Sequence, residues 1–404
     1  MKTTLLTFLF TVCLSAFSQT WTQKANCSLK NNATAFSIGN FGYLATGSSP
    51  QGVTNDLQQY DPNQNLWTTK APFPGRARET AVSFTFQNEA YVGLGWNGSS
   101  TFKDFYAYNS SSNTWRAIQS FPGQGGRNGI AAVVGNKAYV SGGVVGYSTA
   151  ISNQIWELDL ISGTWSLKTN MPFTPQVGAT AFSNDSLLFI GMGHNFNTDS
   201  KIFWSYNPST NVWSRIANFP GSGRLQASVF EINGEFVVGG GHRYGGGISS
   251  SLNDYYAYDP DLNAWSSVPG FAAGRRTRSE GFTINNKGYV VCGSSTSNNY
   301  SDNLWEYSSP LSVGIENQKT TTQKSLILYP NPTENCIYIR TSELVEVGIL
   351  FIYNSKGTLV IEKEIKLDQQ EFEYIEVNNL KPAIYFCKLM TNGGLVFNGT
   401  FIKK

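Results

Sequence analysis

The segment DLQQYDPNQNLW, residues 56–67, recurs along the chain in recognisable form. Four other segments superpose on it without gaps: DFYAYNSSSNTW (104–115), QIWELDLISGTW (154–165), IFWSYNPSTNVW (202–213) and DYYAYDPDLNAW (254–265). The tryptophans that end these segments are successively 48, 50, 48 and 52 residues apart. Self-similarity at a period of about 50 residues predicts an architecture of repeated units.

An apolar segment that ends in glycine lies upstream of each of these units. These segments are YLATG from Tyr43, YVGLG from Tyr91, YVSGG from Tyr139, LFIGMG from Leu188, FVVGGG from Phe236 and a sixth copy, YVVCG from Tyr289. Turn residues such as Gly135-Asn136 and Asp61-Pro62 separate the apolar runs. Each unit therefore contains four short strands, and this pattern predicts a β-propeller.

The repeat resembles the kelch repeat, which is also found in galactose oxidase. The shared features are the glycines after the second strand, the Tyr-Asp pair on the third and the spaced tryptophan, over residues 21 to 310. The sixth unit lacks a tryptophan strand, whereas WTQKA from Trp21 matches WTTKA from Trp67. Pairing the N-terminal strand into the last unit removes an exposed edge. We therefore predict an all-β protein, a six-bladed kelch-type β-propeller closed by the N-terminal strand, followed by a small antiparallel β-sandwich.

The N-terminus predicts export. Lys2, an apolar run from Leu5 to Leu14 and the small residues before Gln19 indicate a signal peptide, residues 1–18. This apolar run is too short for a stable transmembrane anchor, and no later segment reaches the required length. We expect the propeller to occupy residues 19–310, followed by a linker at 311–324.

The last part of the chain, residues 325–404, differs from the repeats. All 10 tryptophans precede it, and runs such as CIYIR and VGILFIYN predict an antiparallel sandwich. The features YPNP (329–332), IYNSKG (352–357), LKPAIYF (380–386) and the terminal lysines resemble the C-terminal sorting domain of the type IX secretion system, although Ala383 stands where that family usually has glycine. The resemblance implies contact with the outer-membrane secretion machinery and a secreted or surface-attached product. An ordinary accessory sandwich is the alternative.

Charge and cysteine content restrict the partners. The formal charge is +2 and no basic run is longer than Arg275-Arg276, which disfavours nucleic acid as a partner. Four cysteines follow the signal peptide, and an exported protein can form disulfides. Cys27 and Cys292 are expected on non-adjacent strands of one blade, beyond bridging distance. Pairing of Cys336 with Cys387 stays open.

One face of the predicted propeller is rich in arginine. Loops into the first strand and loops after the second strand emerge on this face, and they carry eight of the ten arginines of residues 19–310 together with both histidines. Aromatic and guanidinium groups suit a carbohydrate or carboxylate ligand. We predict a ligand site that contains Arg78, Trp96, Arg127, His194, Arg224, His242, Arg243 and Arg278. In the alternative interpretation, the arginines cap strand ends and pair with Glu79 or Glu280.

Catalytic motifs are not recognised in the sequence. We find no nucleophile elbow, HExxH, CxxC or phosphate-binding glycine loop. The resemblance to galactose oxidase suggests copper, but that family's site needs a crosslinked cysteine, and no cysteine is expected on the loop face. We therefore assign no metal, cofactor or catalytic residue and favour a binding module for a glycan, an acidic sugar or a protein ligand on the loop face. The alternative is a sugar-modifying enzyme similar to kelch sialic-acid mutarotases, in which an arginine holds the carboxylate and a Glu or His moves a proton.

Overall fold

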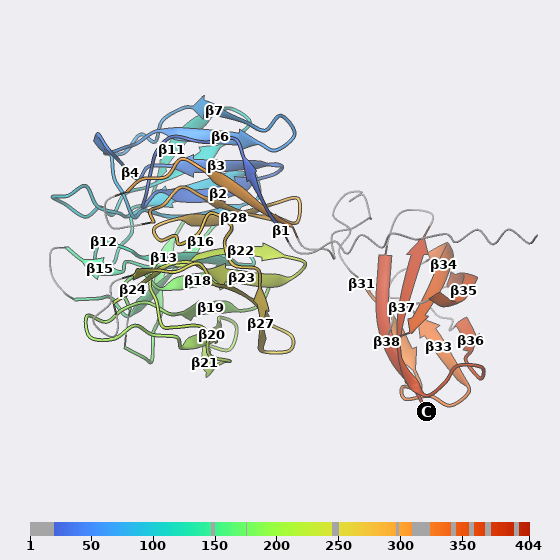
Figure 1. Ribbon diagram of the computed structural model, residues 1–404. Helices are drawn as coiled ribbons and strands as arrows, with labels where there is room; N and C mark the ends of the chain where they lie inside the picture. Colours follow the sequence, from blue (N-terminus) through green and yellow to red (C-terminus); the bar gives the residue numbers. More distant parts are fainter. Residues whose placement is uncertain are drawn as a thin grey trace, which may run out of the picture. The chain divides into compact units, whose positions relative to one another are not determined.

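The computed structural model describes residues 20–146, 150–174, 176–244, 250–295, 299–308, 324–340, 345–354, 359–367, 373–391 and 396–404 (Figure 1). The elements in these residues are all strands, which confirms the predicted all-β class. The chain divides into two compact units, residues 1–313 and 314–404. The predicted signal peptide and residues 311–323 of the predicted linker lie outside the described residues. No helix among the described residues is long and apolar enough to span a membrane.

Four-stranded antiparallel sheets make up most of the first unit, and six of them are formed by the described residues. The first contains β2 (Thr34–Ile38), β3 (Phe41–Ala45), β6 (Leu57–Asp61) and β7 (Leu66–Lys70). The second contains β8 (Val82–Phe86), β9 (Glu89–Gly93), β10 (Phe105–Asn109) and β11 (Thr114–Ile118). The third contains β13 (Ile130–Val134), β14 (Lys137–Ser141), β16 (Gln154–Asp159) and β17 (Trp165–Asn170).

The remaining sheets repeat this order. The fourth contains β18 (Thr180–Ser183), β19 (Leu188–Gly191), β20 (Phe203–Asn207) and β21 (Val212–Arg215). The fifth contains β22 (Ser228–Ile232), β23 (Glu235–Gly239), β26 (Tyr255–Asp259) and β27 (Ala264–Val268). The sixth contains β28 (Glu280–Ile284), β29 (Lys287–Val291), β30 (Leu304–Ser308) and β1 (Thr20–Lys24). Short pairs in the loops are β4 (Ser48–Ser49) with β5 (Gly52–Val53), β12 (Gly126–Arg127) with β15 (Val144–Val145), and β24 (His242–Arg243) with β25 (Ser250–Ser251).

The first strands of the sheets contact one another in sequence order. β8 contacts β2 and β13, β18 contacts β13 and β22, and β28 contacts β22 and β2. The N-terminal strand β1 pairs antiparallel with β30, with Trp21 opposite Tyr307. The Trp21 ring also lies 4.9 Å from the Phe271 ring and donates its Nε1–H to Pro269 O at 3.1 Å. The two ends of the propeller segment therefore share one sheet.

The repeated tyrosine and tryptophan stabilise the packing between sheets. Tyr108 is fully buried and donates its hydroxyl to Asn113 Oδ1 at 2.8 Å. The same Asn113 oxygen accepts the Ala71 backbone N–H, and the Trp115 indole donates to Ala71 O at 2.9 Å. Asn113, two residues before the tryptophan, thus connects its strand hairpin to the segment that follows the previous sheet. Our sequence interpretation did not single out this asparagine, although it recurs at Asn65, Asn211 and Asn263.

The second unit contains a five-stranded and a three-stranded sheet. The first consists of β31 (Lys324–Ser325), β38 (Val396–Lys403), β37 (Ala383–Thr391), β34 (Val345–Asn354) and β35 (Leu359–Leu367), and the second of β32 (Ile327–Tyr329), β33 (Cys336–Arg340) and β36 (Glu373–Glu376). Side chains of both sheets, including Ile337, Ile352 and Leu389, form one buried core. Cys336 and Cys387 are both free thiols in this unit, and Cys27 and Cys292 are free in the first.

Candidate functional site

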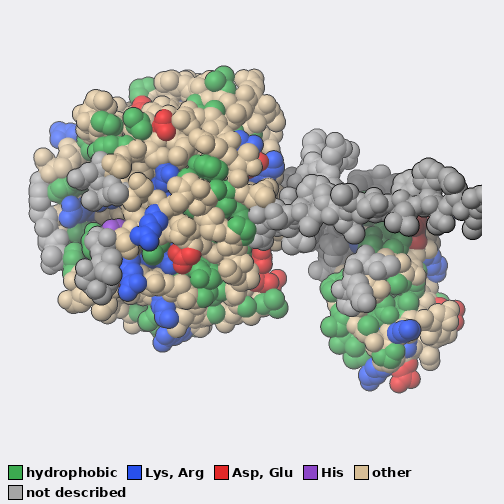
Figure 2. Space-filling model, in the orientation of Figure 1, with side chains coloured by type: hydrophobic (Ala, Val, Ile, Leu, Met, Phe, Trp, Pro, Cys, Tyr) green, Lys and Arg blue, Asp and Glu red, His purple; other side chains and the backbone are tan. Residues whose placement is uncertain are grey.

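Two sets of loops meet on one face of the first unit, and we call this the loop face. Each loop into a first strand forms a backbone bridge with a loop after a second strand. These bridges join Glu79 with Trp96, Val177 with His194, Leu225 with His242, and Thr277 with Ser294. Figure 2 shows basic side chains and a histidine side chain on the propeller surface near these loops. The topology therefore brings the predicted loops together, and the side-chain directions decide which residues a ligand can reach.

Arg78 points inward from the loop face. Its guanidinium is fully buried, and its two Nη atoms donate to the Asp104 carboxylate at 2.7 and 2.8 Å. Nη1 also donates to Leu94 O at 2.9 Å, and the guanidinium lies 4.7 Å from the Phe73 ring centre. Because every side of this cation has a partner, we no longer include Arg78 in the candidate ligand site.

Arg224 has the same arrangement in the fifth repeat. The side chain is fully buried, both Nη atoms donate to Asp254 at 2.7 Å, and Nη1 donates to Gly240 O at 3.0 Å. The Phe219 ring lies 4.6 Å from the guanidinium. Arg224 also leaves the candidate site, because its donors hold the loops together. This agrees with the alternative interpretation that arginines stabilise strand ends, although their partners are aspartates rather than Glu79 or Glu280.

Two other repeats contain an equivalent buried cation. Arg276 donates to Cys292 O at 3.1 Å and to Asn303 Oδ1 at 3.0 Å. Lys30 donates to Thr46 O at 3.0 Å and forms an ion pair with Asp56. We use the term cation bridge for this unit: a buried Lys or Arg that joins the carbonyl after the second strand to the acid or amide before the third strand. The sequence signal for it is a basic residue and an acid at fixed positions of the repeat.

Of the remaining predicted residues, all except Arg278 form two groups on the loop face, and Arg278 lines the cavity described below. In the first, the Arg127 guanidinium lies 4.5 Å from the centre of the Trp96 ring, and both side chains are half-buried. This cation–π contact has the geometry of a stable exposed pair. The group joins the second and third repeats and leaves part of each side chain accessible.

Both histidines belong to the second group, in which they flank Tyr244. The Tyr244 ring centre lies 5.1 Å from that of His194 and 4.5 Å from that of His242. His194 Nδ1 hydrogen bonds to Asp199 Oδ1 at 2.8 Å, and the Tyr244 backbone N–H donates to Asp199 Oδ2 at 2.8 Å. Burial lowers the pKa of His242, and the positive charge of Arg278 lowers it further. We call His194, Asp199, His242 and Tyr244 the histidine group; predicted Arg243 is adjacent to it in β24.

Metal coordination receives no support from these contacts. The described residues contain no group of three or more His, Cys, Asp or Glu side chains arranged to hold a metal ion. His194 already uses Nδ1 with Asp199, and His242 contacts the Tyr244 ring. Hydrogen bonds and ring contacts therefore hold the histidine group together.

A narrow cavity of about 220 Å³ lies among the first strands. Six equivalent residues with positive φ line it where the chain enters these strands: Asn32, Thr80, Asn128, Gly178, Gln226 and Arg278. Glu280 lies two residues beyond Arg278 and lines the same cavity. Burial raises the pKa of Glu280 to about 8, because desolvation disfavours the charged carboxylate. The cavity therefore contains one carboxyl group whose protonation changes near neutral pH.

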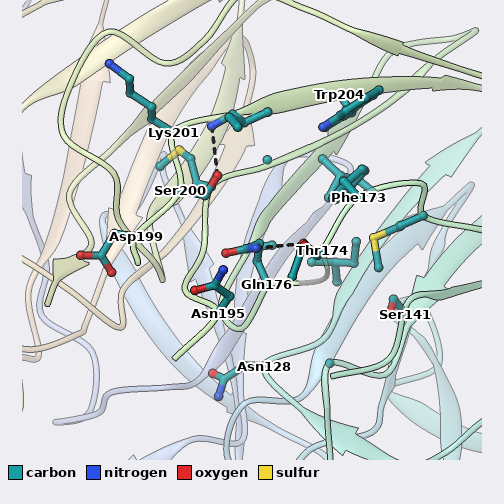
Figure 3. A pocket seen from close by; sticks show the side chains of 18 of the residues that line it. Asn128, Ser141, Phe173, Thr174, Gln176, Asn195, Asp199, Ser200, Lys201 and Trp204 are labelled. Carbon is teal, nitrogen blue, oxygen red and sulfur yellow. Dashed lines mark hydrogen bonds between the residues drawn. The ribbon is translucent and has the colours of Figure 1, made fainter. Parts of the chain in front are cut away.

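A larger pocket of about 680 Å³ opens between the third and fourth repeats (Figure 3). In Figure 3, Phe173 and Trp204 lie together on one side of it, Asp199 lies on the opposite side, and Gln176 and Asn195 lie between them. This volume is typical of small-molecule sites, which measure about 300 to 1,000 Å³. None of our eight predicted site residues lines this pocket. The signal in the sequence is that the fourth repeat has Gln176 and Ile202 where the fifth repeat has Arg224 and Asp254.

Comparison with known proteins agrees with both units. A family model described as the KLHDC2/KLHL20/DRC7 Kelch-repeats domain matches residues 32–241 and, in an overlapping second alignment, residues 128–313. A model described as a secretion system C-terminal sorting domain matches residues 313–404. A comparison with curated proteins finds no match.

Solved structures show the same fold. One of the 476 matching chains is described as "Structure of YjhT"; it superposes with a TM-score of 0.61 and 17% identity, over 70% of this chain and 96% of that chain. At this identity the likeness concerns the fold alone.

Proposed function

The chain belongs to the kelch-repeat family and ends in a secretion-system sorting domain, and from this premise we propose that it is an exported propeller whose loop face binds a carbohydrate or an acidic ligand. In this proposal the six sheets are the blades of a closed propeller, and β1 completes the last blade. Residues 1–18 are a signal peptide, and residues 325–404 direct the protein to the type IX machinery.

The main observation that supports the binding proposal is the histidine group. His194 and His242 come from loops of different repeats, yet both contact the same exposed tyrosine, Tyr244. Arg278 comes from a third repeat and acts electrostatically on His242. Rigid strands that present aromatic and charged side chains from separate loops are a common basis for ligand binding. Arg127 over Trp96 supplies a second accessible cation and ring on the same face.

A panel of neutral and acidic glycans tests this proposal. We expect an acidic member to bind the purified propeller, and Arg278→Ala to weaken that binding at least tenfold because a paired charge is lost. Arg76→Ala is the matched control, since Arg76 is an exposed arginine of the same loop face. Equal loss in both variants, or no binding by any member of the panel, would refute a ligand site at Arg278.

Sugar isomerisation is the second candidate function, and Glu280 is the observation that favours it. A carboxyl group with a pKa of about 8 can both donate and accept a proton near neutral pH. Arg278 lines the same cavity and provides a cation for a substrate carboxylate. Anomer exchange of an acidic sugar, followed by NMR, should slow with Glu280→Gln if the protein catalyses it. An unchanged exchange rate in the presence of wild-type protein would leave only the binding proposal.

A further inference from the structure

The pocket between the third and fourth repeats lies where a cation bridge is missing. Gln176 occupies the position that Arg224 has in the fifth repeat, because Val177 bridges His194 as Leu225 bridges His242. Ile202 takes the position of Asp254, directly before the third strand of the sheet. Both halves of the ion pair are therefore replaced by uncharged side chains. Gln176 and Ile202 both line the pocket.

Aromatic packing also changes in the fourth repeat. In its neighbours, a phenylalanine of the entering loop meets the aromatic ring of the third strand edge-on, as Phe219 meets Tyr256 at 78°. Met171 stands at the position of that phenylalanine in the fourth repeat, since its N–H donates to Asn153 O as Phe219 N–H donates to Lys201 O. Phe173 instead lies flat on Trp204, at an interplanar angle of 12°. In the fifth repeat, the Phe219 ring and the Arg224 guanidinium fill the equivalent space. In the fourth repeat, neither a phenylalanine at that position nor an arginine is present.

The third repeat lacks the cation too but remains closed. Gly126 stands at the cation position there, and a Cβ atom added to it would lie 1.9 Å from Gly142 O. The backbone itself thus occupies the space. In the fourth repeat, loss of the cation is accompanied by a cavity of about 680 Å³.

Unpartnered polar groups accompany this cavity. Gln176 donates its amide N–H to Thr174 O at 2.8 Å, but its Oε1 is buried and has no hydrogen-bond partner among the described residues. Trp213 does not line the pocket but packs against Phe173 of its lining, and its buried indole N–H has no partner among the described residues, whereas the equivalent Trp265 donates to Ala217 O at 3.0 Å. Buried polar atoms normally find partners. A ligand in the pocket that donates a hydrogen bond would satisfy Gln176 Oε1.

The lining favours one class of ligand. Ile202 is 37% exposed, and Trp204 is half-buried, so apolar surface faces the opening. A cationic ligand is disfavoured, because Ile202 has replaced the acid, and Lys201 and Arg215 line the pocket. Asp199 also lines it, but its two carboxylate oxygens are already bonded to His194 Nδ1 and to the Tyr244 backbone N–H. A carboxylate group has no hydrogen to donate to Gln176 Oε1, so the ligand group that meets this atom must be a neutral donor. Hydroxyl groups both donate and accept, and sugar rings carry an apolar face that contacts aromatic residues.

We propose that the pocket between the third and fourth repeats binds a neutral sugar in the space that a cation bridge fills in other repeats. Gln176 and Asn195 meet the sugar hydroxyls, and Trp204 with Ile202 contacts its apolar face. The proposal rests on the proposed function only in taking the loop face as the binding face; it does not involve Arg278, which does not line this pocket.

Restoring the missing bridge is the decisive experiment. The double variant Gln176→Arg/Ile202→Asp places an Arg and an Asp where Arg224 and Asp254 stand. Methyl glycosides of neutral hexoses and their disaccharides are the probes, with binding followed by saturation-transfer NMR and calorimetry. We expect at least one probe to bind wild-type protein and the double variant to lose that binding more than tenfold, while its melting temperature stays the same or rises.

Arg76→Ala is the matched control and should bind the neutral probe like the wild type, because Arg76 is exposed and does not line this pocket. Normal binding by the double variant, equal loss of neutral-sugar binding in Arg76→Ala, or no binding of any neutral probe would each overturn the inference. Acidic-glycan binding that depends on Arg278 would then still support the proposed function. If the double variant does not fold, the single substitutions Gln176→Ala and Trp204→Leu must each weaken binding of the neutral probe.

Discussion

Arg224 and Asp254 form a two-pronged ion pair beneath the loop face, with Nη1–Oδ1 and Nη2–Oδ2 distances of 2.7 Å each. The two residues are not equally buried: the arginine side chain is 0% exposed, whereas the aspartate side chain is 38% exposed. A buried guanidinium that loses its partner stays charged, because arginine does not deprotonate in proteins. An exposed carboxylate that loses its partner can be hydrated.

This asymmetry predicts unequal effects of two substitutions. Asp254→Ala should lower the free energy of unfolding by about 3 to 5 kcal/mol, since it leaves an unpaired buried charge. Arg224→Met should cost less, because Asp254 then contacts water and the methionine fills part of the space. Urea denaturation of both variants measures the difference, with Arg76→Ala as a control near wild type. A larger loss for Arg224→Met would contradict this interpretation.

Trp21 should matter as much as a tryptophan inside the repeats. Its ring contacts four aromatic rings of the fifth and sixth repeats: Phe230, Tyr255, Phe271 and Tyr307. Trp21→Ala should therefore destabilise the propeller by about 3 to 5 kcal/mol, the usual range for removal of a large aromatic side chain. Thermal melting of Trp21→Ala and Trp115→Ala should show similar decreases. A negligible decrease for Trp21→Ala alone would argue against closure by β1.

The raised pKa of Glu280 predicts a loss of stability as pH rises. The folded state holds the Glu280 proton up to about pH 8, whereas the unfolded chain releases it near its ordinary value of 4.5. Between these values the folded state binds more protons, so the free energy of unfolding decreases with rising pH and levels off above about pH 8. The size should be up to a few kcal/mol, at about 1.4 kcal/mol per pKa unit.

Glu280→Gln should remove this decrease. Unfolding by urea at pH 5, 7 and 9 should show wild type and variant similar at pH 5 and the variant more stable at pH 9. Glu79→Gln is a suitable control, because Glu79 is a half-buried glutamate of the second repeat's loop. Parallel pH profiles for wild type and Glu280→Gln would show that the Glu280 carboxyl group is well hydrated.

Removal of residues 311–404 should separate folding from export. The propeller has its own buried cores, so the truncated protein should fold, as judged by an unchanged thermal transition of residues 19–310. Without the sorting domain, the truncated protein should accumulate on the periplasmic side of the outer membrane in a host with type IX machinery. Fractionation and immunoblotting of cells and medium measure this. Normal amounts of truncated protein in the medium would disprove the sorting function.

The exposed face of the five-stranded sheet allows a more specific test of which surface the secretion machinery contacts. Ile384, Phe386 and Met390 alternate along β37 with buried neighbours and are 42 to 49% exposed. Ile402 is paired with Ile384 on the same face. Phe386→Ser should reduce secretion if the machinery contacts this face, and its thermal transition should remain. Equal secretion of Phe386→Ser and wild type would place the recognition elsewhere on the domain.

The repeat, the strands and the sorting domain could be predicted from local sequence, because strand formation follows from alternation, turn residues and a constant period. The match between WTQKA and WTTKA was enough to assign Trp21 to the strand that the sixth unit lacks, and the structure pairs its strand β1 with β30. The asparagine at Asn113 repeats almost as clearly, but its role depends on Tyr108 of its own sheet and on Ala71, which directly follows β7 of the previous sheet.

The sequence by itself determined that arginines lie in the loops of one face, since loop membership depends only on strand order. Only the tertiary structure decided that Arg78 and Arg224 point inward, because their partners Asp104 and Asp254 follow 26 and 30 residues later along the chain. The pocket has the same origin. Gln176 and Ile202 are ordinary residues when read singly, and both line a cavity because they stand where the fifth repeat holds the Arg224–Asp254 ion pair.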